Sequence, residues 1–341
     1  MKLVMGILCY ARPLHTALTL AYAYANKAVD TDLHFFYGIP ESGEHKSPSL
    51  RNMLNALAEQ GHGEMHYLPE DGARNTGGNV DNLMETLNAL EGYDCYFKID
   101  DDVIIGPRTD EEMADLLLRP EMEAHKVYIL TAQAVREHMQ GPKAFGWDFK
   151  LGNRMLVCRR RGQSPMETYA AVSYKMLPHL ENAGLRPKCE NDAGTFSGFA
   201  IKLWNTGAKA ALVLYPHVIM QHIGLTCTTG LKAIGVGRSW APAKSWSPAG
   251  RVIQVPYFDF NAWERSHANG TQKEAAQKMI DTLMTCTKHP AVKLIRDELD
   301  KYTPGVGDVD LPTGRADPGP PRNRVTRRNR RKRVTVGRGR V

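Results

Sequence analysis

The sequence contains no pair of cysteines at C-x-x-C spacing and no apolar run of membrane-spanning length. Its six cysteines are scattered along 341 residues, which argues against a zinc knuckle or a disulfide scaffold and for a reducing compartment. A membrane-crossing helix needs about 20 consecutive apolar residues, and no stretch approaches that length. Residues 1–10 lack a small-residue cleavage site, so they are expected to form a first strand rather than a signal peptide. These absences favour a cytoplasmic globular protein without a membrane partner.

Acidic residues are also absent from residues 318–341, where ten lysines and arginines lie. Removing these ten charges changes the formal net charge of the chain from +7 to −3, so the remainder is mildly acidic. From residue 303 onward the chain is rich in proline, glycine and arginine, which predicts a disordered basic tail over residues 303–341. Such a tail binds polyanions without sequence preference, although a solubilising or localising tail has the same composition.

Strand-like and helix-like segments alternate over residues 1–130. Strands are expected over Leu3–Cys9, Leu33–Tyr37, Glu64–Tyr67 and Val127–Leu130, and helices over Pro13–Ala28, Ser49–Gln60, Asn79–Leu90 and Asp110–Leu118. This order predicts an α/β fold with a mostly parallel sheet flanked by helices. Further along, we expect a helix near residues 165–183, one apolar strand over residues 211–223, and helices over Gln272–Thr285 and Pro290–Lys301.

Three adjacent aspartates, Asp100, Asp101 and Asp102, lie inside the apolar segment 96–105. Like charges repel, and their burial is costly unless a cation lies among them. Carboxylate oxygens suit Mg²⁺ or Mn²⁺, and such an ion usually also binds a substrate phosphate. Ligands of parallel α/β sheets bind beyond the carboxyl ends of the strands. We therefore predict a metal and diphosphate site here, the alternative being an exposed acidic turn.

In order and spacing, residues 1–225 resemble the GT-A-fold glycosyltransferases that use nucleotide sugars. Residues 9–13 (Cys-Tyr-Ala-Arg-Pro) resemble the opening donor loop of these enzymes. Residues 75–79 (Asn-Thr-Gly-Gly-Asn) resemble the segment before the helix that leads into their metal motif. The aspartate triplet resembles their Asp-x-Asp motif, and His222 resembles the late histidine that completes the metal site in many members. The resemblance implies a GT-A-like, Rossmann-type sheet.

The resemblance also implies roles for these residues. Asp102 would bind Mn²⁺ or Mg²⁺ directly, Asp100 would contact the metal or the ribose, and Asp101 would support them. His222 would be a further metal ligand, although a lone histidine is as often a core or surface residue. The residues expected to contact the nucleotide sugar, a UDP-sugar by resemblance, are Cys9, Tyr10, Arg12, Asn79, Asp100 and Asp101.

An inverting enzyme needs a carboxylate that takes the proton of the acceptor hydroxyl. Asp192 is the candidate and Glu190 the second choice, because both lie just before a glycine-bearing turn that lets a sugar approach the backbone. A turn or helix-capping acid is the alternative for either residue. The acid pair usual in the family is missing, since no acid lies between Ser197 and His222. The stereochemistry of transfer therefore stays open.

The basic tail, together with Arg159–Arg161, makes DNA a plausible acceptor. The specific hypothesis is sugar transfer to a hydroxymethylated pyrimidine, as viral DNA-modifying glycosyltransferases perform; a protein or glycan acceptor is the alternative. In this interpretation residues 1–130 are the nucleotide-sugar-binding half. Residues 131–302 are the acceptor-binding and catalytic half of the same domain, and residues 303–341 are the tail. The oligomeric state is not predicted.

Two other functions fit parts of the sequence. Residues 100–104 (Asp-Asp-Asp-Val-Ile) resemble the D-x-D-x-V nucleophile motif of haloacid-dehalogenase-like phosphatases, and residues 128–131 resemble their second motif. That nucleophile normally ends the first strand, however, whereas about ninety residues of βα structure precede it here, and no third or fourth motif follows. A nucleic-acid-binding protein is the non-enzyme alternative, but its tail does not explain a buried acidic triplet.

Overall fold

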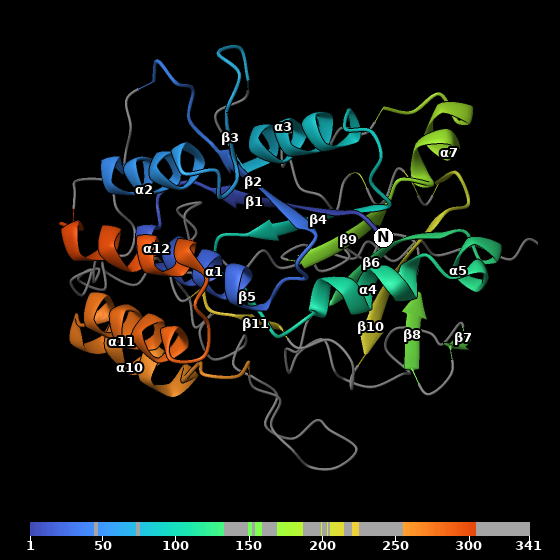
Figure 1. Ribbon diagram of the computed structural model, residues 1–341. Helices are drawn as coiled ribbons and strands as arrows, with labels where there is room; N and C mark the ends of the chain where they lie inside the picture. Colours follow the sequence, from blue (N-terminus) through green and yellow to red (C-terminus); the bar gives the residue numbers. More distant parts are fainter. Residues whose placement is uncertain are drawn as a thin grey trace, which may run out of the picture. The chain divides into compact units, whose positions relative to one another are not determined.

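The computed structural model describes residues 1–43, 47–72, 76–132, 149–151, 154–158, 169–186, 199, 203, 205–214, 220–224 and 255–304 (Figure 1). Residues 159–161, 190, 192 and 305–341 lie outside these ranges. The predictions made for them, including most of the basic tail, therefore stay predictions. Among the described helices, none has both the length and the apolar character that crossing a membrane requires.

Nine of the described strands form one sheet, in the order β3-β2-β1-β4-β9-β6-β10-β8-β7. Their bounds are β1 Leu3–Cys9, β2 Thr31–Tyr37, β3 Glu64–Tyr67, β4 Cys95–Asp100, β6 Val127–Ala132, β7 Phe149–Leu151, β8 Arg154–Cys158, β9 Tyr169–Ser173 and β10 Lys209–Leu214. All run in one direction except β8 and β9, which pair antiparallel with both neighbours. A separate antiparallel pair joins β5 Val103–Ile105 to β11 Met220–His222.

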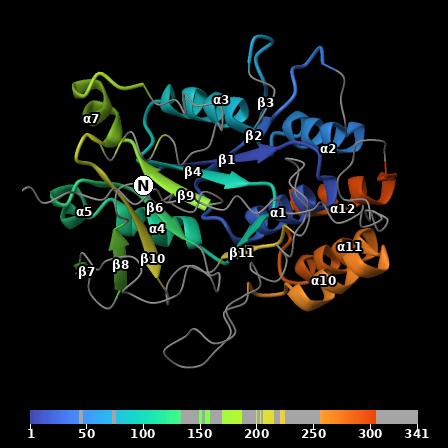
Figure 2. The ribbon, with the colours of Figure 1, turned by 180° about the vertical axis from the view of Figure 1, so that it is seen from behind.

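Helices cover both faces of this sheet (Figures 1 and 2). Their bounds are α1 Pro13–Asn26, α2 Pro48–Glu59, α3 Thr76–Asn88, α4 Thr109–Leu117, α5 Pro120–Ala124, α7 Met176–Asn182, α10 Phe260–Asn269, α11 Gln272–Met284 and α12 Pro290–Lys301. Helices α3 and α7 pack on one face, and α1, α2, α4 and the C-terminal helices α10–α12 lie on the other. The predicted α/β class, with a mostly parallel sheet flanked by helices, is confirmed.

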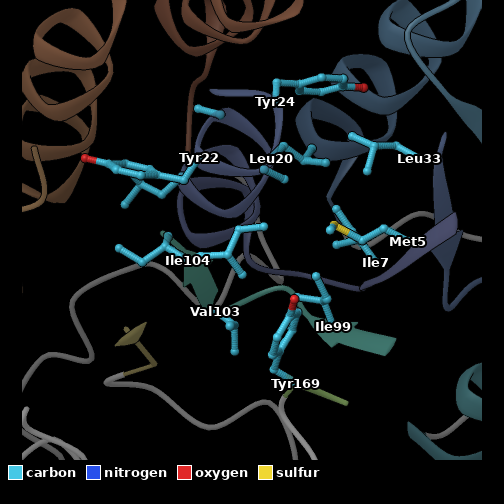
Figure 3. Packing of buried hydrophobic residues seen from close by; sticks show 14 of the residues in the cluster. Met5, Ile7, Leu20, Tyr22, Tyr24, Leu33, Ile99, Val103, Ile104 and Tyr169 are labelled. Carbon is cyan, nitrogen blue, oxygen red and sulfur yellow. The ribbon is translucent and has the colours of Figure 1, made fainter. Parts of the chain in front are cut away.

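The side chains of β1 alternate between two buried cores, as the period of a strand requires. Met5 and Ile7 belong to the larger core, on the face covered by α1. Val4 and Leu8 belong to the smaller core, under α3. Figure 3 shows part of the larger core, in which Ile104 of β5 lies near α1. Strand β5, which directly follows the aspartate triplet, is therefore anchored in apolar packing.

Gly6 of β1 determines how closely α3 approaches the sheet. A Cβ atom at this position would lie 2.8 Å from Leu83 Cδ1 and 2.9 Å from Leu87 Cδ1, both in α3. Real Cβ atoms do not approach other atoms so closely, so glycine allows the helix to pack directly on the strand. The first turn of α3, which carries Asn79, is placed at the sheet edge by this contact.

Two predictions for the middle of the chain are wrong. Residues 169–173 form β9, and among the other described residues of the helix predicted near 165–183 only 176–182 are helical. All five residues of β9 are buried between β4 and β6, so the strand lacks the polar alternation that identifies strands, and its alanines favour helix. The single strand expected over residues 211–223 is two strands, β10 in the large sheet and β11 paired with β5.

Candidate functional site

The carboxyl ends of β1, β2 and β4 lie at one edge of the sheet. The register pairs Leu8 of β1 with Asp100 of β4. The Gly38 N–H, just after β2, donates to the carbonyl of Cys9 over 2.9 Å. The segments that follow the three strands, namely Tyr10–Arg12, Gly38 and the aspartate triplet, therefore meet at this edge, where parallel sheets bind ligands.

Tyr10 and Asn79 both lie close to Gly38 at this edge. The Asn79 Nδ2 atom donates to the carbonyl of Phe36 over 2.9 Å, which ties the start of α3 to the end of β2. A Cβ atom on Gly38 would lie 3.2 Å from Tyr10 Cδ2 and 3.3 Å from Asn79 Nδ2, so a larger residue would displace one of them. The buried Asn79 Oδ1 atom has no hydrogen-bond partner within the described ranges, and it can accept a hydrogen bond from a ligand.

The three aspartates differ in exposure. Asp100, the last residue of β4, exposes 26% of its side chain, whereas Asp101 and Asp102 expose 6% and 8%. The Thr19 hydroxyl of α1 donates to the carbonyl of Asp101 over 3.0 Å. The Ile223 N–H donates to the carbonyl of Asp102 over 2.8 Å. The acidic turn is therefore held by α1 on one side and by the residue after β11 on the other.

Two basic side chains bind the aspartates. Arg12 Nη1 lies 2.5 Å from Asp102 Oδ2, and Arg12 Nη2 bonds Asp101 Oδ1. Burial by itself lowers the pKa of the Arg12 guanidinium, but the charges of both aspartates outweigh burial and hold this pKa above its ordinary value. Lys98, two residues before Asp100 on the same face of β4, places its Nζ atom 2.5 Å from Asp100 Oδ1.

The charges of Arg12 and Lys98 do not fully offset the effect of burial on the pKa values of Asp100 and Asp101. Burial raises the pKa of Asp101 to about 6 against the attraction of Arg12, and the charge of Asp102 adds to the rise. Burial also raises the pKa of Asp100, with the charge of Lys98 acting in the opposite direction. A further cation at the triplet would lower these pKa values, because it favours the ionised form of each carboxyl.

The donor atoms at the triplet fit a hard divalent ion. Asp101 Oδ2 is buried and accepts no hydrogen bond from any described residue, and Asp100 is partly exposed at the sheet edge. Carboxylate oxygens of this kind are the ligands that Mg²⁺ and Mn²⁺ prefer, and such sites normally include oxygens of a bound phosphate. The residues present therefore fit the predicted metal.

The backbone of His222 lies next to the acidic turn. His222 is the last residue of β11 and pairs with Val103, the residue directly after Asp102. The next residue, Ile223, accepts a 2.9 Å hydrogen bond at its carbonyl from the indole Nε1 of Trp263 in α10. The structure thus brings the predicted histidine position to the aspartates, although its side chain lies outside the described part of the molecule.

Three predicted site residues remain: one is a buried cysteine, and two are acids outside the described ranges. The Cys9 side chain is 1% exposed, and its Sγ atom lies 3.5 Å from the carbonyl of Ile7. Burial raises the pKa of this thiol well above its ordinary value, so the sulfur belongs to the apolar core and only the backbone of Cys9 faces the edge. Glu190 and Asp192, the candidates for the general base, fall in the undescribed range 187–198.

Sequence reasoning missed that Arg12 and Lys98 act as counter-ions of the triplet. For Lys98 a signal existed, because residues two apart on a strand share a face and a buried aspartate there requires a partner. For Arg12 no local signal existed. It is 90 residues from Asp102 in sequence, and their contact follows from the pairing of β1 with β4.

The chain matches no family model and no curated protein. Solved structures that resemble it include Staphylococcus aureus TarS residues 1–349 alone, with a TM-score of 0.43 and 11% identity, covering 89% of each chain. The same fragment in complex with UDP has a TM-score of 0.43 and 10% identity over 89% of each chain. A longer TarS structure has a TM-score of 0.42 and 9% identity over 89% of this chain and 55% of that chain. This distant likeness assigns no activity to the protein.

Proposed function

We propose that the protein is a metal-dependent glycosyltransferase that moves a sugar from a nucleotide-diphosphate donor to an acceptor hydroxyl. The observation that carries the proposal is the meeting of the aspartate triplet with Tyr10, Arg12 and Asn79 at one sheet edge. Loss of a diphosphate from a sugar requires that its developing negative charge be stabilised, which a divalent ion supplies as a Lewis acid. A site with three carboxylates and no ion would instead repel that diphosphate.

The chain's own residues have distinct parts in this proposal. Asp102 and Asp100 hold Mn²⁺ or Mg²⁺, His222 adds a ligand, and Asp101 supports the site through its bond to Arg12. The guanidinium of Arg12 keeps positive charge beside the diphosphate and orients the buried carboxylates.

The donor is proposed to be a UDP-sugar, and the nucleotide is proposed to lie over Tyr10 and the amide of Asn79, whose Oδ1 atom can accept a hydrogen bond from the base. Asp192, or Glu190 in its place, is proposed to take the proton of the acceptor hydroxyl.

The lead acceptor is a hydroxymethylated pyrimidine in DNA, because the ten basic residues of 318–341 match the charge of a polyanion. A protein or glycan is the second candidate. The test is incubation of the protein with a panel of nucleotide sugars and Mn²⁺, with and without hydroxymethylated DNA, followed by measurement of free nucleoside diphosphate. Release that rises only with hydroxymethylated DNA supports the proposed acceptor; no release with any nucleotide sugar contradicts the proposed activity.

Phosphatase chemistry at Asp100 is expected to be absent. A phosphoryl nucleophile must attack phosphorus and form an aspartyl-phosphate, and in such phosphatases it normally ends the first strand, whereas Asp100 is the last residue of β4. Incubation with simple phosphomonoesters and Mg²⁺ should therefore release no phosphate above that of the Asp100→Asn variant. Acid-stable labelling of Asp100 by a phosphate donor would favour the phosphatase and contradict sugar transfer.

Deletion of residues 318–341 is expected to weaken DNA binding and leave donor chemistry unchanged. The deletion removes ten positive charges, and each phosphate contact contributes about 0.9 or less to the slope of log affinity against log salt concentration. Titration of duplex DNA against full-length and truncated protein at two salt concentrations measures both affinity and slope. Equal values for the two proteins would remove the main support for a DNA acceptor, whereas nucleotide-sugar hydrolysis without acceptor should be the same in both.

A further inference from the structure

A second group of metal-ligand side chains lies on β2 and β3, away from the aspartate triplet. The parallel register pairs His34 with Glu64 and Phe36 with His66. Residues two apart on a strand share a face, so the two histidines and Glu64 lie on one face at the edge of the sheet. His34 is the middle residue of β2, whereas the triplet adjoins the carboxyl ends of the strands.

The three side chains converge on one point. His34 Nδ1 lies 2.8 Å from His66 Nε2, and each of these nitrogens lies 3.8 Å from an oxygen of Glu64. A separation of 3.8 Å is too long for a hydrogen bond, so the Glu64 carboxylate faces both nitrogens without bonding to either. Tetrahedral zinc with ligands at about 2.0–2.2 Å places neighbouring ligand atoms roughly 3.3 Å apart, which lies between the observed distances.

The surroundings favour neutral, oriented imidazoles. Burial lowers the pKa of His34, as does the neighbouring charge of His66, and burial lowers the pKa of His66. Neutral imidazole nitrogens are common metal ligands. The ring of Phe36 lies against that of His66, with centroids 4.7 Å apart and planes 13° from parallel, which fixes the orientation of His66. Glu64 remains 65% exposed, so its carboxylate supplies charge and can adjust its position.

A pocket of about 400 Å³ adjoins this group. His34 and Glu64 line it, together with Lys27, His62 and His289. Two histidines and one glutamate with an accessible fourth position form the ligand set of zinc sites that bind water or a substrate atom. The pocket therefore supplies the space for a fourth, non-protein ligand.

We propose that His34, Glu64 and His66 bind Zn²⁺, with a water molecule or a small anion from the pocket as the fourth ligand. In the metal-free protein one of the two facing nitrogens donates its hydrogen to the other. Zinc binding requires that this hydrogen move to the opposite nitrogen of its ring, so that both facing lone pairs bind the ion, and that the nitrogens separate by about 0.5 Å. The bound ion would also fasten β3, at the edge of the sheet, to β2.

The site can be tested by zinc titration of the full-length chain against a chromophoric chelator. The variants are His66→Gln and Glu64→Gln. The control is His62→Gln, which changes a histidine that lines the same pocket but lies outside the triad of His34, Glu64 and His66. Each triad variant is expected to bind the tightest zinc ion at least about tenfold more weakly, since even loss of an outer-sphere partner costs about that much. Glu64 is exposed, so Glu64→Gln keeps the test valid if His66→Gln does not fold.

Cobalt provides the second measurement and separates this site from the triplet. Co²⁺ bound by two imidazoles and a carboxylate in tetrahedral geometry absorbs strongly in the visible range, and the band should persist in Asp102→Asn but disappear in Glu64→Gln or His66→Gln. Equal zinc affinity in the triad variants and in His62→Gln would overturn the proposal. Loss of the cobalt band in Asp102→Asn, or its absence from the wild type, would overturn it as well.

Discussion

Replacement of Asp102 with asparagine is expected to lower nucleotide-sugar turnover by at least about two to three orders of magnitude, the effect of removing one preorganised electrostatic group from a transition state. Asparagine keeps the shape of the side chain and can still accept the hydrogen bond from Arg12 Nη1. It removes the negative charge that the divalent ion requires. Release of free nucleoside diphosphate measures the effect, and far-ultraviolet circular dichroism shows whether the fold is kept.

The matched control is Asp115→Asn, which removes a carboxylate that is 63% exposed and pairs with Arg119 on the surface. This control should turn over the donor as the wild type does. Excess chelator should stop the wild type and Mn²⁺ should restore it, while His222→Ala should weaken metal dependence less completely, because diphosphate and water oxygens can replace one ligand. Full turnover in excess chelator, or in Asp102→Asn, would contradict the proposed metal site.

Replacement of Arg12 with glutamine is expected to lower the free energy of unfolding of the metal-free protein by about 3–5 kcal/mol near neutral pH. The change leaves Asp101 and Asp102 buried without their shared cation, and breaking a buried ion pair from one side costs about that much. Denaturant unfolding in the presence of chelator measures the loss. Arg108→Gln, which removes an exposed ion pair with Glu111, is the control and should leave stability almost unchanged.

The decrease in the free energy of unfolding caused by Arg12→Gln should depend on pH. A carboxyl whose pKa is higher in the folded than in the unfolded protein binds more protons when folded, so stability falls as pH rises between the two values. For Asp101 this window runs from its ordinary value of 3.8 to about 6. Arg12 lowers this pKa, so its removal extends the window upward, and the variant should lose more stability than the wild type between about pH 4 and about pH 7. If the difference in stability between the wild type and Arg12→Gln were the same at about pH 4 and at about pH 7, this result would contradict the burial of the ion pair.

The first half of the fold could be predicted from sequence because its elements are defined locally. The bounds of β1 and β3 agree with the expected strands, and α1 and α2 differ from prediction by only a few residues. Their apolar residues recur at helical or strand spacing, and proline or glycine marks several ends. Strand β9 could not be predicted, because a strand buried on both faces carries no periodic signal.

The candidate site was predictable in composition but not in its contacts. The aspartate triplet could be recognised from the sequence because its three charged residues and the apolar segment around them are neighbours in the chain. The ion pairs of Arg12 and the group formed by His34, Glu64 and His66 arise from pairing between different strands. Such pairing depends on register and strand order, which no single segment encodes.

The hydrogen bond from Trp263 to Ile223 places a constraint on how the protein matures during its synthesis. Asp102 leaves the ribosome about 160 residues before Trp263, which corresponds to roughly 8–30 s at ordinary elongation rates. During that interval the acidic turn exists without α10 and without the helices α11 and α12 that pack on α1. The three helices thus complete the support of a site to which they contribute none of the proposed ligands. A nascent chain or fragment that stops before α10 would carry the aspartates without the packing that holds β11 against them.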